Sequence, residues 1–173
     1  MQTRHSMAEL NALSAEEFVR VIGPVFERSP WIAHETSARR PFAGTDELLG
    51  ALCDTVRNAS DDKKLALIRA HPDLAGRLAL ASALLTKESL GEQAAAGLDS
   101  LTPEELALFQ QQNEAYRRKF DFPFIICARL NKKEAILEAL RRRRQNSRDQ
   151  EIRAALEEIF KIAGLRLRDL IVE

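Results

Sequence analysis

Apolar residues follow helical spacing through most of the chain, and the alternation typical of strands is almost absent. Leu65 and Ile68, like Leu67 and Ala70, lie three positions apart, so each pair falls on one side of a helix. The one strand-like run, FPFIICARL, is too isolated to build a sheet. Two later regions carry apolar faces at helical spacing: Ile136, Leu137 and Leu140, and then Ile152, Leu156, Ile159 and Phe160.

Helix start signals divide this pattern into separate elements. Ser14 and Glu17 form a predicted capping box, in which hydroxyl and carboxylate satisfy the free amides of a first helical turn. Thr102 and Glu105 form another, with Pro103 at the first helical position. Further caps are expected at Thr45, Ser60, Asn131 and Ser147. The sequence therefore predicts an all-α fold, a single compact multi-helix domain of about seven or eight helices, over residues 1–173 with the first several residues frayed.

Composition narrows the function classes. With 45% hydrophobic and 30% charged residues, the 173-residue chain has the composition of one globular domain. Lys and Arg together number 26, as do Asp and Glu, so net charge favours neither nucleic acid nor an acidic membrane. The run RRRR at 141–144 ends a predicted helix, where cations suit the helix dipole and solvent. Binding of an acidic partner by this run remains an alternative.

Targeting and metal-binding signals are missing from the sequence. No apolar run approaches the roughly 20 residues of a membrane span, and the N-terminus lacks the apolar core of a signal peptide. Cys53 and Cys127 lie among apolar neighbours without CxxC spacing, which indicates reduced thiols and a cytoplasmic protein. No zinc-type spacing, P-loop or GxGxxG occurs, so no metal is expected.

His71 is the first candidate for chemistry. Proline disfavours helical backbone in the residue before it, so the helix after Ser60 should end ahead of Pro72 and leave His71 at its C-terminus. Imidazole changes charge near neutral pH, and the helix dipole favours its protonated form there. Spacing alone does not decide between a histidine that ends a helix and one that moves a proton.

A second candidate lies in LTKESLGEQAAAGL, residues 85–98. If Thr86 caps this helix, Ser89, Glu92 and Gln93 share one face, as a ligand-facing surface would require. Ser89 and Glu92 also fit a plain capping box, and polar faces are common on helices. On these residues alone the structural interpretation is the stronger one.

Two further segments complete the candidates. FDFPFIICARL could expose backbone groups to a ligand, or could be a buried connection in which Cys127 is a small hydrophobe. In IAGLRLRDL, Arg166 and Arg168 are two positions apart and cannot share a helix face. One of these arginines is therefore expected to point inward while the other stays in water.

Together these segments resemble a known family. The order HPDLAG, LTKESLGEQAAAGL, FPFIICAR and KIAGLRLRDL is similar to that of the 2-oxo-4-hydroxy-4-carboxy-5-ureidoimidazoline (OHCU) decarboxylases of urate degradation. ERSPWIA at 27–33 and RRPF at 39–42 are similar too, so the resemblance extends from about Leu10 to Leu170. It implies an all-helical, cofactor-free enzyme, commonly a homodimer, that releases CO₂ from a small anionic substrate to give S-allantoin.

The resemblance also implies residue roles. His71 matches the family's catalytic histidine and Glu92 its catalytic carboxylate, which suggests a general acid/base and a group that orients the substrate. The chain stops without the S-K-L type of peroxisomal ending, which favours a cytoplasmic, bacterial enzyme. The positions that match substrate contacts are Pro72, Ser89, Leu90, Gly91, Gln93, Phe124, Ile125, Ile126, Cys127, Ala128 and Arg166.

Two other classes stay open. A helical interaction module could use RRRR to bind an acidic partner, and its affinity would then fall steeply with salt. A different lyase or hydrolase could use the same histidine and carboxylate. Neither alternative requires SLGEQ and FPFIICAR together, so the decarboxylase interpretation is preferred.

Overall fold

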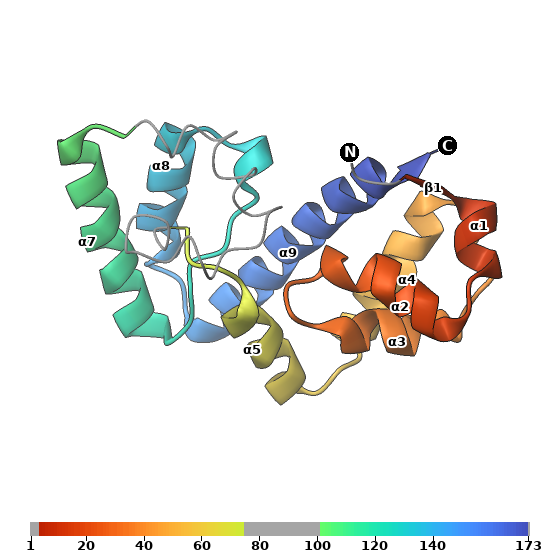
Figure 1. The fold of residues 1–173 in the computed structure, drawn as a ribbon. Helices are drawn as coiled ribbons and strands as arrows, with labels where there is room; N and C mark the ends of the chain where they lie inside the picture. Colours follow the sequence, from red (N-terminus) through yellow and green to blue (C-terminus); the bar gives the residue numbers. More distant parts are fainter. Residues whose placement is uncertain (1–3, 75–100, 173) are drawn as a thin grey trace. The chain divides into compact units, whose positions relative to one another are not determined.

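The computed structural model describes residues 4–74 and 101–172 of the chain. Their contacts divide into two compact units, one formed by Met1–Ala70 with Phe160–Glu173 and the other by His71–Ile159. Figure 1 shows the helices and strands of both units with their labels. In the two described ranges no helix combines the length and the apolar character needed to cross a membrane. The single domain over 1–173 stays a prediction.

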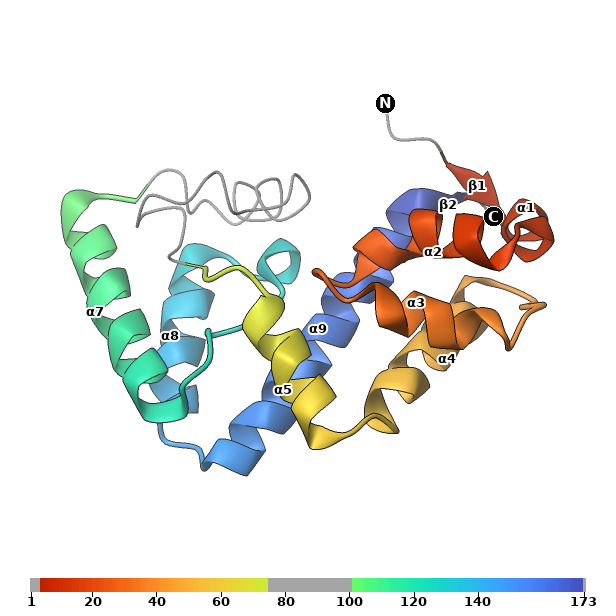
Figure 2. The ribbon, with the colours of Figure 1, turned by 60° about the horizontal axis from the view of Figure 1, so that its bottom comes forward.

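The first unit is built from short helices joined by tight connections. Figure 2 shows α3 between α2 and α4, and it packs against both. The two short strands pair in parallel, with His5 opposite Ile171, which joins the two ends of the described chain. The elements of this unit are β1 (His5–Ser6), α1 (Met7–Ala12), α2 (Ala15–Ile22), η1 (Gly23–Val25), α3 (Pro30–Ser37), α4 (Thr45–Arg57), α5 (Asp61–Ala70), the C-terminal part of α9 (Arg148–Leu170) and β2 (Ile171–Val172).

Apolar side chains fill the centre of the first unit. A Cβ atom on Gly164 would lie only 3.1 Å from Leu49 of α4, so the missing side chain lets α9 approach α4 closely. Burial of the apolar side chains at the centre of this unit stabilises its short helices, because isolated helices of this length are marginal in water. The fully buried members include Leu10, Phe18, Ile22, Ile32, Leu48, Leu52 and Val56.

The second unit contains α7 (Pro103–Phe120), η2 (Ala128–Leu130), α8 (Lys133–Arg143) and the first part of α9, and α7 packs against α8. Asp121 ends α7 in a left-handed conformation, φ 60°, which turns the chain back along the helix it has just left. The chain then places Phe122 and Phe124 against Tyr116, at ring-centroid distances of 6.2 and 5.2 Å. Packing of these aromatic rings holds the segment that follows α7 against that helix.

The predicted fold class is confirmed. Within residues 4–74 and 101–172 the structure has eight α-helices and one two-stranded sheet. FPFIICARL forms no strand, as expected, and ends in the short helix η2. The capping boxes at Ser14 and Thr102 are present, and a third, at Ser6 and Glu9, begins α1.

Of the four other caps predicted within the described residues, two are present and two are not. Ser60 and Ser147 accept hydrogen bonds from the backbone N–H groups three residues on, and α5 and α9 start directly after them. Thr45 is not a cap, because α4 begins at Thr45 itself and Gly44 precedes it. The cap predicted at Asn131 is also wrong. The side-chain amide of Asn131 donates to the carbonyl of Cys127, 3.0 Å away, and α8 starts after Lys132.

Candidate active site

His71 is the first residue after α5, which ends at Ala70 as the following proline predicts. Its side chain is buried, with 7% of the residue exposed to solvent. Imidazole is suited to proton transfer because its unperturbed pKa lies near neutrality, and burial can hold the ring in one orientation. The position of His71 at a helix end is therefore compatible with a chemical role.

The residue two positions after His71 holds this segment in place. The Oδ1 atom of Asp73 accepts a hydrogen bond from the amide of Asn113 at 2.8 Å, and Oδ2 accepts one from Arg117 at 2.7 Å. Both donors come from α7, so two bonds attach the His71–Pro72–Asp73 segment to that helix. Sequence reasoning missed Asp73; an acidic residue directly after a histidine and proline was the signal available.

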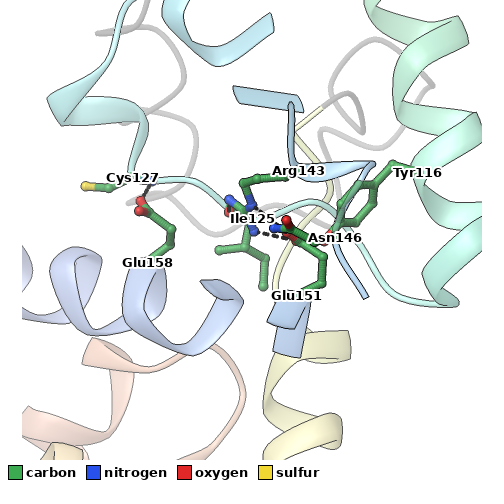
Figure 3. Close-up of polar contacts among 7 residues, drawn as sticks. All are labelled: Tyr116, Ile125, Cys127, Arg143, Asn146, Glu151 and Glu158. Carbon is green, nitrogen blue, oxygen red and sulfur yellow. Dashed lines mark hydrogen bonds and ion pairs between the residues drawn. The ribbon is translucent and has the colours of Figure 1, made fainter. Parts of the chain in front are cut away.

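The segment from Phe124 to Ala128 is buried and is held through its backbone (Figure 3). The guanidinium of Arg143 donates to the carbonyl oxygen of Ile125 over 2.6 Å. The N–H of Cys127 donates to the Oε2 atom of Glu158 over 2.8 Å. The two contacts come from different helices, α8 and α9, and fix residues on either side of Ile126.

Arg143 itself belongs to a buried polar network (Figure 3). Its Nε atom lies 3.1 Å from both carboxylate oxygens of Glu151, and its Nη2 atom lies 2.9 Å from Oε2. The carboxylate also accepts hydrogen bonds from the hydroxyl of Tyr116 and from the amide of Asn146. Burial of Tyr116, and then its hydrogen bond to Glu151, raise the pKa of its hydroxyl.

This network corrects one interpretation of the sequence. The run 141–144 was expected to lie in solvent at the end of a helix, but Arg143 is buried. A guanidinium can be buried when its donors are used, and here Glu151 and Ile125 accept from it. Only the other arginines of the run remain for an acidic partner, which weakens that alternative.

Arg166 lies in the other unit, on the C-terminal part of α9. It is buried, and its guanidinium donates to the carboxylate of Glu27 at 2.9 Å and to the carbonyl of Val25 at 3.3 Å. Arg168 is exposed, so the prediction that only one of the two arginines points inward is confirmed. Glu27 was not singled out from the sequence, although it begins the segment ERSPWIA.

The remaining candidates divide by location. His71, Pro72 and the segment 124–128 belong to one unit and Arg166 to the other. In the described ranges, no group of three or more His, Cys, Asp or Glu side chains is arranged to hold a metal ion. The predicted cap Thr86 and the candidates Ser89, Leu90, Gly91, Glu92 and Gln93 lie outside the described residues.

Comparison with known proteins extends over nearly the whole chain. The model of the family described as OHCU decarboxylase matches residues 11–168. A protein of Halalkalicoccus jeotgali named 2-oxo-4-hydroxy-4-carboxy-5-ureidoimidazoline decarboxylase is 43% identical over 170 residues, covering 98% of this chain and 94% of its own. The mouse protein of the same name is 39% identical, covering 95% of this chain and 92% of its own.

Solved structures give the same fold. The crystal structure of an (S)-allantoin synthase matches with a TM-score of 0.77 and 31% identity over 96% of this chain. This chain spans 54% of that longer one. A crystal structure of an OHCU decarboxylase in the presence of (S)-allantoin matches with a TM-score of 0.68 and 26% identity, covering 90% of this chain and 96% of its own.

Proposed function

The chain belongs to the OHCU decarboxylase family, and on that premise we propose how its residues carry out the reaction. The protein is a carboxy-lyase that decarboxylates 2-oxo-4-hydroxy-4-carboxy-5-ureidoimidazoline in urate degradation, with S-allantoin as the product. The observation that carries this conclusion is the likeness to decarboxylases over almost the full length of both chains.

The substrate largely determines what the protein must supply. Its carboxylate is attached to a carbon that also bears a hydroxyl group and adjoins a ring C=N. When the bond to the carboxylate breaks, CO₂ leaves and the electron pair enters the conjugated ring. A proton delivered to one face of the ring then fixes the configuration of the product. The protein must therefore orient the substrate, stabilise the developing charge and place one proton donor.

We propose that His71 is this general acid/base. Two observations support this role: His71 is buried, and Asp73 attaches its segment to α7 through hydrogen bonds with Asn113 and Arg117. Glu92 is proposed to hydrogen-bond the substrate hydroxyl and orient the reacting carbon. This role rests on the match to the family's carboxylate.

Substrate binding is assigned to three groups. Arg166 provides a planar guanidinium for the anionic or ureido part of the ligand, and Glu27 and Val25 already hold it in one orientation. Backbone groups of the segment Phe124–Ala128 pair with the amide-like edges of the ring. Pro72, Ser89, Leu90, Gly91 and Gln93 are proposed as further substrate contacts, on their match to the family.

Two further proposals are made, the first from family membership and the second from the two cysteines that are expected to be reduced thiols. The protein is a homodimer, and it acts in the cytoplasm. Sedimentation velocity at micromolar concentration tests the first, with a monomer as the contradicting result. Fractionation of the source cells tests the second.

The decisive experiment is circular dichroism of the product formed from freshly hydrolysed 5-hydroxyisourate. Spontaneous decay gives racemic allantoin, which has no circular dichroism signal. With the protein present, we expect allantoin to form faster than by spontaneous decay and to be optically active. Racemic product at the spontaneous rate would overturn the assigned reaction.

The role of His71 has its own test. We expect His71→Ala to lose roughly 10²–10⁴-fold in turnover, the usual contribution of general acid/base catalysis. His34→Ala is the matched control, because His34 is exposed on α3. Turnover by a folded His71→Ala protein at the level of the control would exclude His71 as the proton donor.

A further inference from the structure

We infer that Arg143 and Glu158 are positioning residues for the substrate, because they fix the backbone of the segment Phe124–Ala128 from two helices. The inference rests on the proposed function, in which this segment contacts the ligand. Neither side chain is placed in contact with the substrate. Each acts through the backbone group that it holds.

The geometry of Arg143 supports this role. The Nε and Nη2 atoms of its guanidinium donate to Glu151, and the Nη1 atom donates to the carbonyl of Ile125 at 2.6 Å. The guanidinium carbon also lies 4.5 Å from the centre of the Phe124 ring. Arg143 therefore touches two consecutive residues of the segment, with a directional hydrogen bond on one and a cation–π contact on the other.

The cost of burying these charges argues against a purely stabilising role. Glu151 is fully buried and accepts hydrogen bonds from Arg143, from Tyr116 and from Asn146. Well-packed apolar side chains can replace such a buried pair with little loss of stability, or even a gain. An apolar side chain could not, however, donate to the carbonyl of Ile125. The pair thus supplies a fixed donor that packing alone cannot supply.

Glu158 completes the arrangement from α9. Its Oε2 atom accepts from the N–H of Cys127 at 2.8 Å, two residues after the carbonyl that Arg143 holds. Neither contact uses the N–H or C=O of Ile126, which lies between the two fixed points. With both neighbours held, the backbone of Ile126 keeps one orientation, which is what recognition of a small ring with amide-like edges requires.

The test separates substrate binding from turnover. For Glu158→Ala we expect KM to rise about 3- to 10-fold, the effect of one misplaced hydrogen bond, with kcat changed less. Glu158→Gln keeps an oxygen acceptor and should recover most of this loss in KM. Glu151→Gln should also raise KM, because a neutral partner holds Arg143 less firmly. If Glu151→Gln does not fold, Asn146→Ala removes one bond to the same carboxylate at a half-buried site.

Leu52→Ala is the control for general destabilisation. Leu52 belongs to the core of the other unit, so the variant should lower the melting temperature while leaving KM unchanged. Unchanged KM in Glu158→Ala and Glu151→Gln would overturn the inference, as would an equal rise in Leu52→Ala. The proposed reaction is tested separately, since its failure would appear as racemic product from the unmodified protein.

Discussion

The guanidinium of Arg166 and the carboxylate of Glu27 form a buried ion pair, 2.9 Å apart, between residues separated by 139 positions in the sequence. Only 6% of the arginine side chain and 2% of the glutamate side chain are exposed. A second ion pair joins Arg168, also on α9, to Asp46 of α4 at 3.3 Å. Its two side chains are exposed, at 56% and 88%. The two pairs share their chemistry and differ in solvation.

This difference gives the first prediction. Glu27→Ala removes the carboxylate that pairs with the buried guanidinium of Arg166, and it should lower the free energy of unfolding by about 3–5 kcal/mol. Asp46→Ala breaks the solvated pair and should cost less than about 1 kcal/mol. Urea unfolding followed by far-ultraviolet circular dichroism measures both values. Equal losses in the two variants would contradict the assignment of a buried pair.

The second prediction concerns the segment that carries His71. Asp73→Ala removes both bonds to α7, so His71 should lose its fixed position and kcat should fall about 10- to 100-fold. Arg117→Ala is the matched control, because it removes only the bond from a half-exposed side chain and leaves Asn113 in place. Its kcat should stay within about 3-fold of the unmodified protein. Steady-state kinetics at saturating substrate decides between these outcomes, and a normal kcat for Asp73→Ala would contradict the anchoring role.

The third prediction uses the single tyrosine of the chain, Tyr116. Burial and the bond to Glu151 raise its pKa above the ordinary value of 10.0, so the folded state favours the protonated hydroxyl. The resulting stability is complete below pH 10 and is lost as the pH rises above it. Tyrosinate absorbance should therefore appear only together with unfolding, and near pH 10 when the protein is in urea. Ionisation of the folded protein near pH 10 would contradict the prediction, and Tyr116→Phe provides the baseline.

The fourth prediction concerns the capping box that begins α7. Hydrogen bonds from the backbone of Thr102, and then from Lys133, lower the pKa of Glu105 below its ordinary value of 4.5. The ionised carboxylate therefore contributes stability above pH 4.5, which is lost as the pH falls through its lowered pKa. Glu105→Gln should show a smaller decrease in urea midpoint on acidification than the unmodified protein. Identical pH dependence in the two proteins would contradict a role for this carboxylate.

Much of the helical framework follows from neighbouring residues. Ser14, Thr102 and Ser147 cap helices because the amides that they satisfy lie three positions further on, and Pro72 limits α5 because its ring clashes with the residue before it. Asn131 shows the limit of such reasoning. Its side chain could have capped α8, but its amide donates instead to the carbonyl of Cys127.

The sequence by itself determined the helical class, most helix starts, the end of α5 at His71 and the resemblance that names the reaction. Only the tertiary structure decided which charged residues meet: Glu27 with Arg166, Asp73 with Arg117, and Arg143 with Glu151. Capping depends on residues within one helical turn, which the sequence displays directly. An ion pair between helices depends on which faces pack together, and burial then decides whether the pair is strong, so neither property can be read from spacing.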